Sequence, residues 1–329
     1  MYKYIPGDPG KMTRQRLGQS PFGDTDFGDF MKQYFHGEKK NAPYFEGWYF
    51  KCQTREGHCL ALIPAMHIDK NKGRSASIQV ITEERSWYLE YPASSFAASR
   101  DFLEIQIDKN RFSEAGVFLD IQRDGLSLHG SVNFGPFRGL KSDIMGPFRW
   151  LPHMECAHSV ISMAHSLHGA FTLNGSLWDL DDGSGYVEAD RGRSFPVEYL
   201  WTQCMWEVCS LMLSIATIPF GKFGFTGCIC AISLGGREHR LATYRGVKID
   251  NWSAQGALLR QGKYRLQVEL LDQKAQALRA PAEGNMNRTV HESLCARVRY
   301  RFWIQKRLVF DHTSNHAGFE YGKEIIPEV

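Results

Sequence analysis

The feature that most constrains the fold of this chain is an alternation of apolar and polar residues with a period of two. It recurs from one end of the sequence to the other, for example at 102–108, 126–134, 264–270 and 292–304, whereas helical periodicity hardly appears. Successive side chains of a β-strand point to opposite faces of a sheet, so this pattern predicts strands with one buried and one wet face. The predicted fold class is therefore mainly β.

Turn signals and chain length indicate how these strands are organised. Glycine- and aspartate-containing clusters lie at 69–73, 123–125, 181–185 and 235–236. Many strands at short spacing are typical of antiparallel sandwiches and barrels. A chain of 329 residues also exceeds one ordinary core. We therefore expect two tandem antiparallel β-barrel domains.

The alternation lapses in two places, which suggests the domain limits. Residues 1–42 are irregular and contain several glycines and prolines, with one short helix expected near 27–35. The second lapse is GLKSDIMGPFRWLP at 139–152. We predict an irregular N-terminal segment over 1–42, a first β domain over 43–150 and a second over 151–329.

A search for an internal repeat across this boundary gives only a faint match. FEGWYFKC at 45–52 and VEYLWTQC at 197–204 both contain Glu, Trp and Cys in that order. The spacing from Glu to Trp differs by one residue between them. Chance explains such a match adequately, so we predict no repeat from it.

Charge and hydropathy argue against several classes of partner. The net charge is +3, which gives no reason to expect nucleic acid or an anionic membrane as a partner. The long apolar run at 208–220 contains Pro219 and is followed by Lys222, so it is too short for a spanning helix. The N-terminus has no apolar signal-peptide core. We expect a cytoplasmic protein without a transmembrane segment.

The cysteines and the aromatic residues bear on what the interior holds. No two of the cysteines form a C-x-x-C pair, and most lie in strand-like runs, which favours buried free thiols over disulfides or a metal site. Aromatic residues make up 13% of the chain. That density is compatible with large β cores or with a cavity for a flat apolar ligand. The cysteines stand at positions 52, 59, 156, 204, 209, 228, 230 and 295.

Five segments, in this order, resemble the tocopherol cyclase family. They are KNAPYFEGWYFK at 40–51, GYVEADRGRSFPVEYLWTQ at 185–203, SIATIPF at 214–220, LATYRG at 241–246 and HAGFEYG at 316–322. The resemblance covers nearly the whole chain beyond residue 40. It implies two lipocalin-like β-barrels in tandem, within a calycin-like group that includes carotenoid hydratases.

The resemblance also implies a chemistry. Plant enzymes of the family bind a prenylated hydroquinol, protonate a double bond of its side chain, and close a chromanol ring when the phenol oxygen attacks the resulting cation. This isomerase-type reaction needs no cofactor. Two alternatives remain open: a hydratase-like enzyme that adds water to an isoprenoid double bond, and a non-catalytic carrier of a lipophilic ligand.

A carbocation mechanism requires a carboxylic acid that stays protonated, aromatic faces that stabilise the cation, and an acceptor for the phenol proton. Glu46 is a candidate acid, because it lies in the aromatic stretch PYFEGWYFK and shares a predicted strand face with Trp48. With the neighbouring Tyr49, Trp48 is also a candidate ligand-binding residue. The alternative is that Glu46 pairs with a buried arginine or caps a backbone bend and thereby locks the first strand to its neighbours.

The second candidate site lies at 186–203. Tyr186, Glu188 and Asp190 alternate onto one predicted strand face, where two neighbouring carboxylates favour a protonated form of one of them. Trp201 offers an aromatic ring to a cation, and Gln203 shares its face. The alternative is that the two carboxylates pair with nearby arginines in a loop.

Histidines form a third group, in PHMECAHSVISMAHSLHG at 152–169. Their spacing matches no zinc motif, so we expect no metal ligand set here. His158 is the one candidate acid or base among them, with a structural role as the alternative.

Overall fold

The structure is a computed structural model that describes residues 34–150, 154–207, 209–220 and 223–323. Within these ranges the protein is mainly β, as predicted. Most of the irregular segment expected over 1–42, and nearly all of the helix expected near 27–35, lie outside the described residues. No helix in the described ranges is long and apolar enough to cross a membrane.

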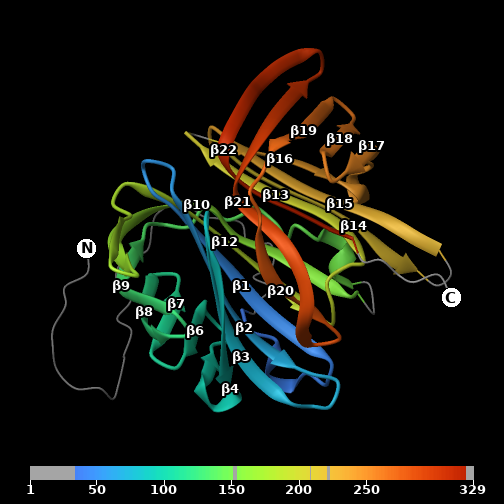
Figure 1. The fold of residues 1–329 in the computed structure, drawn as a ribbon. Helices are drawn as coiled ribbons and strands as arrows, with labels where there is room; N and C mark the ends of the chain where they lie inside the picture. The colour runs from blue at the N-terminus through green and yellow to red at the C-terminus, as the bar shows by residue number, and fades with distance from the viewer. Residues whose placement is uncertain (1–33, 151–153, 208, 221–222, 324–329) are drawn as a thin grey trace, which may run out of the picture. The chain divides into compact units, whose positions relative to one another are not determined.

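In the described part of the chain, the elements are two antiparallel sheets (Figure 1) and four short 3₁₀ helices. The first sheet contains β1 (Tyr44–Gln53), β2 (Cys59–Ile68), β3 (Arg74–Thr82), β4 (Ser86–Pro92), β5 (Phe96–Ala98), β6 (Glu104–Ile107), β7 (Asn110–Ser113), β8 (Gly116–Arg123), β9 (Leu126–Phe134), β10 (Cys156–Leu173), β11 (Ser176–Asp179) and β12 (Gly183–Gly192). The second contains β13 (Glu198–Trp206), β14 (Cys209–Phe220), β15 (Phe223–Leu234), β16 (Arg237–Ala242), β17 (Lys248–Ser253), β18 (Gly256–Gln261), β19 (Tyr264–Asp272), β20 (Gln276–Ala282), β21 (Asn285–Ile304) and β22 (Arg307–Lys323). The 3₁₀ helices are η1 (Gly37–Lys39), η2 (Ala93–Ser95), η3 (Gly146–Trp150) and η4 (Thr243–Arg245).

Each sheet is barrel-like because its two edge strands are consecutive in the chain. The first sheet has the order β4-β3-β2-β1-β12-β10-β9-β8-β7-β6-β5, and only η2 separates β4 from β5. The second has the order β16-β15-β14-β13-β22-β21-β19-β18-β17, and only η4 separates β16 from β17. A one-turn connection brings the two edges together, which reduces the exposure of unpaired strand edges. The structure thus has the two tandem lipocalin-like barrels that we predicted.

Burial follows the alternation from which the strands were predicted. In β6, for example, Ile105 and Ile107 are buried and Gln106 is exposed. In β9, Leu128 and Val132 are buried, whereas the residues between them face outward in part. Buried apolar side chains of the first sheet form one core, and those of the second sheet form another. All eight cysteines are free thiols, six of them buried.

The chain passes from the first sheet to the second between Gly192 and Glu198, at the junction of β12 and β13. The domain limit that we predicted, between 150 and 151, lies instead in the connection from β9 to β10, two strands that pair within the first sheet. The reason is that β12 pairs with β1, and β10 pairs with β12, so both strands belong to the first sheet. The division into domains at 43–150 and 151–329 therefore does not coincide with the sheets, and independent domains stay a prediction.

The two sheets share a plan, and the faint sequence repeat lies on equivalent strands. The runs β1–β4 and β13–β16 each occupy one side of a sheet, and the first strand of each run pairs with a later strand, β12 or β22. The segment 45–52 lies in β1, and the segment 197–204 lies in β13 apart from Val197; the two strands hold equivalent places. Their shared pattern, which we attributed to chance, thus accompanies a repeated topology.

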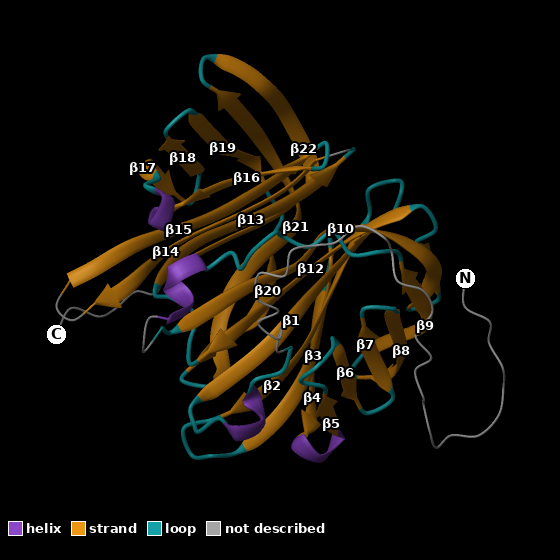
Figure 2. Ribbon diagram, turned by 180° about the vertical axis from the view of Figure 1, so that it is seen from behind, coloured by secondary structure: helices purple, strands orange, loops and turns teal. Residues whose placement is uncertain are grey.

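The two sheets lie against each other (Figure 2). A third apolar cluster contains buried residues from both of them. It contains residues from β1, β2, β10 and β12 of the first sheet and from β13, β14 and β21 of the second, including Tyr49, Tyr186 and Trp201. The β20–β21 hairpin also reaches the first sheet, because Gln79 of β3 exchanges hydrogen bonds with the backbone of Arg279 in β20. Part of the outer face of the first barrel, on β1, β2, β3, β10 and β12, is therefore covered by residues of the second sheet.

Candidate active site

A cavity of about 180 Å³ lies within this interface. Residues from both sheets line it, and its wall is mostly apolar. Its aromatic lining residues are Phe45, Tyr49, Phe148, Phe195, Tyr199 and Trp201. Its ionisable lining residues include His67, Glu155, His158, Glu188, Asp190, Arg279, Glu292 and Glu320. Aromatic faces with a few convergent carboxyl groups are typical of a site for an apolar ligand that is to be chemically modified.

Strand β1 contributes only one of its faces to this cavity. Phe45, Gly47 and Tyr49 line the cavity. Glu46 and Trp48 alternate with them and are not among the lining residues; Trp48 belongs to the core of the first barrel. Gly47 leaves room here, because a Cβ atom at this position would lie 3.3 Å from the Cβ of Ala65.

Glu46 instead holds the segment that precedes β1. Its Oε2 accepts hydrogen bonds from the His36 backbone N–H at 2.9 Å and from the Tyr44 hydroxyl at 2.9 Å. Its Oε1 lies 2.7 Å from Nδ1 of His36. These contacts satisfy a buried carboxylate, as buried charges require. They correspond to the alternative in which Glu46 holds the first strand to its surroundings.

Glu188, Asp190 and His158 form a compact polar group at the cavity wall. Nδ1 of His158 lies 2.9 Å from Oδ1 of Asp190, and its Nε2 lies 3.3 Å from Oε2 of Glu188. Burial of His158 opposes a charged ring, but the carboxylates of Asp190 and Glu188 raise its pKa well above the usual value. A histidine cation thus stands between the two carboxylates that we expected to repel each other on one face of β12.

Glu188 is the centre of a further set of hydrogen bonds. Its Oε2 accepts one from the Tyr186 hydroxyl at 2.5 Å and one from Nε1 of Trp201 at 3.2 Å. The Trp201 ring meets the Tyr49 ring edge to face, with 5.4 Å between centroids. Gln203 lies beyond Trp201 on β13, outside the cavity, and accepts a hydrogen bond from the buried Lys51 at 3.2 Å.

The sequence reasoning missed two buried glutamates in this cavity. Glu292 of β21 and Glu320 of β22 are directly opposite each other in the sheet. The Tyr49 hydroxyl donates to Oε1 of Glu292 at 2.6 Å, and the Tyr199 hydroxyl donates to Oε1 of Glu320. Burial, together with the neighbouring carboxylate, raises the pKa of Glu292 to about 8. Burial likewise raises the pKa of Glu320 to about 7. One proton is therefore held within this pair at neutral pH.

Signals for both glutamates were present in the sequence. Glu320 lies in HAGFEYG, a segment that carries the family resemblance. Glu292 has the spacing of Leu294 and Ala296, the apolar face of its strand. A carboxyl group on a buried strand face is a candidate for a raised pKa.

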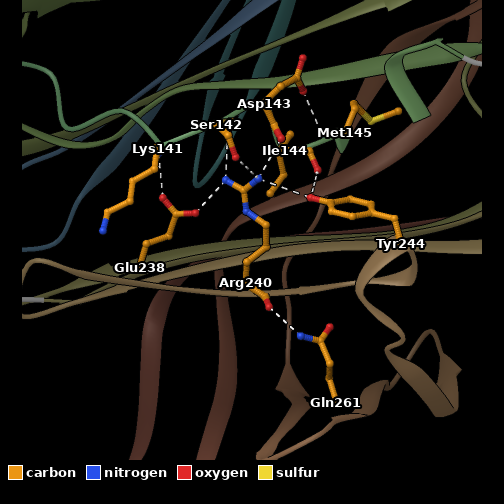
Figure 3. Close-up of polar contacts among 9 residues, drawn as sticks. All are labelled: Lys141, Ser142, Asp143, Ile144, Met145, Glu238, Arg240, Tyr244 and Gln261. Atoms are coloured by element: carbon orange, nitrogen blue, oxygen red, sulfur yellow. Dashed lines mark hydrogen bonds and ion pairs between the residues drawn. The ribbon is translucent and has the colours of Figure 1, made fainter. Parts of the chain in front are cut away.

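The connection between β9 and β10 supplies one wall of the cavity through Met145 and Phe148. Arg240 of β16, only 3% exposed, holds this connection in place (Figure 3). Its Nη1 donates to the Asp143 carbonyl at 2.8 Å, and its Nη2 donates to the Ser142 carbonyl at 2.8 Å. Its Nη2 also lies 2.7 Å from Oε1 of Glu238, which balances the charge. The Tyr244 hydroxyl also binds this connection, since it donates to the Ile144 carbonyl at 2.9 Å. The buried guanidinium group is therefore one of two side chains that hold this cavity wall.

Among the described residues, two groups of side chains have a composition that could hold a metal ion. One is His158 with Glu188 and Asp190, whose ligand atoms lie within 4.8 Å of one another. It belongs to two strands, β10 and β12, so the spacing within the histidine-rich segment did not reveal it. The other group consists of Cys59, Cys295 and His316, on β2, β21 and β22.

The structure brings together part of the predicted site. Tyr49, His158, Glu188, Asp190 and Trp201 line the cavity, with Tyr186 behind Glu188. Glu46, Trp48 and Gln203 do not line it. Of the other histidines, His165 is enclosed by Phe134 and Phe137, and burial lowers its pKa to about 3.

Comparison with known proteins gives one family and one fold. A sequence model described as "Tocopherol cyclase-like" matches residues 127–323. A search of curated proteins finds no match.

Solved structures share the fold at very low sequence identity. Kievitone hydratase from Nectria haematococca is similar with a TM-score of 0.52 and 8% identity, over 86% of this chain and 90% of that one. CghA in complex with Sch210972 is similar with a TM-score of 0.55 and 10% identity, over 86% and 89%. A protein described as a putative AttH from Nitrosomonas europaea has a TM-score of 0.51 and 12% identity, over 85% and 93%. At such identities the likeness establishes the fold alone.

Proposed function

The chain belongs to the tocopherol cyclase-like family, and from that premise we propose that it binds a prenylated hydroquinol or related isoprenoid in the cavity between its barrels. In this proposal the protein protonates a side-chain double bond and closes a chromanol-type ring. The observation that carries the proposal is the buried pair Glu292 and Glu320, which holds a proton at neutral pH within an aromatic cavity.

Glu292 is the proton donor in this mechanism. Tyr49 donates to its Oε1, which leaves Oε2 as the oxygen that carries the transferable proton. With a pKa of about 8, Glu292 is protonated at neutral pH and is still a stronger acid than a phenol. A general acid is most effective when its pKa is near the working pH.

The rings around Glu292 stabilise the cation that protonation creates. Tyr49 and Trp201 offer aromatic surface to the cavity, and Tyr199 lies beside Glu320. Burial raises the pKa of Tyr49 and Tyr199 well above the usual value, so both hydroxyls keep their protons. The interaction of a cation with an aromatic face is strongest where water is excluded.

The proton balance closes within the cavity. The donor proton forms a new C–H bond, the phenol oxygen forms the C–O bond, and the phenol proton passes to a carboxylate. Glu188 is our candidate acceptor, since His158 stands beside it as a compensating cation. Transfer between carboxyl groups then restores Glu292, and the substrate and product are isomers. No cofactor takes part.

A hydratase is the second candidate, because kievitone hydratase shares the fold. The first step would be the same, and water would trap the cation in place of the phenol oxygen. A carrier that binds the ligand without turnover is the third.

An incubation with a prenylated hydroquinol in heavy water tests the proposal. The expected product has the mass of the substrate plus one non-exchangeable deuterium, as read by chromatography and mass spectrometry. Glu292→Gln should lose at least about 100-fold in rate, because general acid catalysis contributes about that much or more. Glu46→Gln is the matched control, since Glu46 is also buried but lies outside the cavity.

The possible products of this incubation distinguish the three candidate functions. A mass gain of one water supports the hydratase, and bound but unchanged substrate supports the carrier. Loss of turnover in Glu46→Gln with turnover retained in Glu292→Gln would reject our assignment of the donor. A cytoplasmic location and the absence of a nucleic-acid partner stay predictions from the sequence.

A further inference from the structure

A second cluster of chemically active side chains lies outside the cavity, at another point where the two sheets meet. It consists of Cys59 at the start of β2, Cys295 of β21 and His316 of β22. We propose that these three residues bind a zinc ion that joins the first barrel to the second.

The geometry suits zinc. One ligand atom from each of the three residues lies within 4.8 Å of the other two. Tetrahedral zinc bound to two thiolates and one imidazole places those atoms about 3.5 to 3.8 Å apart, given bonds of about 2.0 to 2.3 Å. Only small side-chain movements separate the observed cluster from a coordinating one. Two cysteines and one histidine are also a donor set that zinc prefers over magnesium or calcium.

A buried lysine lies beside the cluster: Nζ of Lys51 donates to the His316 carbonyl at 2.9 Å. Its positive charge offsets part of the negative charge of the two thiolates that bind zinc. Binding of zinc would release the thiol protons to solvent and change no oxidation state.

His316 has a nitrogen free for the metal. Its Nδ1 is buried and has no hydrogen-bond partner among the described residues. Its ring packs on Gly57, where a Cβ atom would lie 2.3 Å from Cε1 of the ring. Gly57 has φ of 98°, so the turn before β2 both requires glycine and makes space for the imidazole.

Two irregularities in the pairing of β21 with β22 bring these ligands together. The register shifts between Ser293 and Ala296, and again between Ala296 and Val298. Cys295 lies within the first shift, and His316 lies opposite the second. Bulges of this kind redirect side chains next to functional sites.

Glu83 completes the surroundings of the proposed zinc ion. Its Oε1 accepts a hydrogen bond from the Cys59 backbone at 3.2 Å and lies 3.4 Å from Nδ1 of His58. The fourth coordination position is open to this carboxylate or to water. Cys295 and His316 are partly exposed, which gives an ion a route of entry.

Cobalt substitution in the full-length protein tests the proposal. The purified protein is stripped of metal under reducing, oxygen-free conditions and titrated with Co²⁺. We expect one Co²⁺ per chain, with a thiolate charge-transfer band and the intense visible absorption of tetrahedral cobalt. Zn²⁺ should then displace the cobalt, because this type of site binds zinc more tightly.

Variants locate the site. Cys59→Ala, Cys295→Ala and His316→Ala should each weaken zinc binding by at least about 100-fold, by comparison with the effect of changing groups outside a coordination sphere. Cys228→Ala is the matched control, because Cys228 is a buried strand thiol in the core of the second barrel. It should bind the metal like the wild type.

Several results would overturn the proposal. The first is absence of the charge-transfer band in the wild-type protein. The second is a loss of zinc affinity in Cys228→Ala equal to that in the ligand variants. The third is mass-spectrometric evidence that Cys59 and Cys295 form a disulfide that excludes metal. The wild-type spectrum alone decides whether two thiolates bind, so a variant that fails to fold does not remove the test.

Discussion

Replacement of Glu292 by glutamine should change how the stability of the protein depends on pH. The pKa of Glu292 is about 8 in the folded protein, compared with 4.5 for an ordinary glutamate. The folded state therefore keeps a proton that the unfolded chain has already lost. The contribution of this group to the free energy of unfolding is fully present below about pH 4.5 and is lost as the pH rises towards 8.

The size of this effect follows from linkage. Each proton of difference changes the free energy of unfolding by about 1.4 kcal/mol per pH unit. As the pH rises from 4.5 to about 8, ionisation of Glu292 thus lowers the free energy of unfolding by at most about 5 kcal/mol. The figure is an upper limit, because Glu320 titrates with it as a pair. Glutamine preserves the shape of the side chain and cannot ionise, so Glu292→Gln should lose this part of the pH dependence.

Urea unfolding from about pH 5 to about pH 9 measures the effect. Relative to the wild type, Glu292→Gln should become more stable as the pH rises, by several kcal/mol across the range. The exposed Glu56 gives a control, and Glu56→Gln should follow the wild-type curve. Parallel curves for the wild type and Glu292→Gln would refute the raised pKa.

Three further predictions concern groups around the cavity. Glu46→Gln should destabilise the protein by about 1 to 3 kcal/mol, because the backbone N–H of the partly buried His36 and the buried Tyr44 hydroxyl lose a carboxylate acceptor. Calorimetry checks this, and weaker binding of the ligand would contradict the separation of Glu46 from the cavity. Arg240→Met should cost about 3 to 5 kcal/mol and should also weaken ligand binding, because Glu238 loses its cation and the cavity wall loses its hydrogen bonds to Arg240. Unchanged affinity in a fluorescence titration would show that this wall does not depend on Arg240. Asp190→Asn should lower the pKa of His158, since Asp190 is the main charge that raises it, and an NMR titration with the same midpoint as the wild type would argue against the contact.

The sequence predicted the barrels well because alternation is a local property. The buried positions Ile105 and Ile107 follow directly from their spacing, and the same rule predicted the strands at 126–134 and 264–270. The limits of the sheets depend on pairing between distant strands. The return of β12 to pair with β1 leaves no local signal near residue 192.

The same distinction explains the site residues. Strand periodicity correctly places Glu46 and Trp48 on one face, but it does not say whether that face meets the barrel interior or the cavity between the barrels. Glu292 lies opposite Glu320 because β21 and β22 form a hairpin. The hydrogen bond from Tyr49 to Glu292 joins residues of the two different sheets. Cys59 and His316 are likewise distant in the sequence, so no spacing motif connects them.

The protonation state of Glu292 at neutral pH is the central claim, and infrared spectroscopy measures it most directly. The spectrum of the wild-type protein should contain a protonated carboxyl C=O band at about pH 7, which disappears as the pH rises through about 8. The band should be absent from, or strongly reduced in, Glu292→Gln and should persist in Glu46→Gln. A wild-type spectrum without this band, or a band that Glu292→Gln leaves unchanged, would contradict the account.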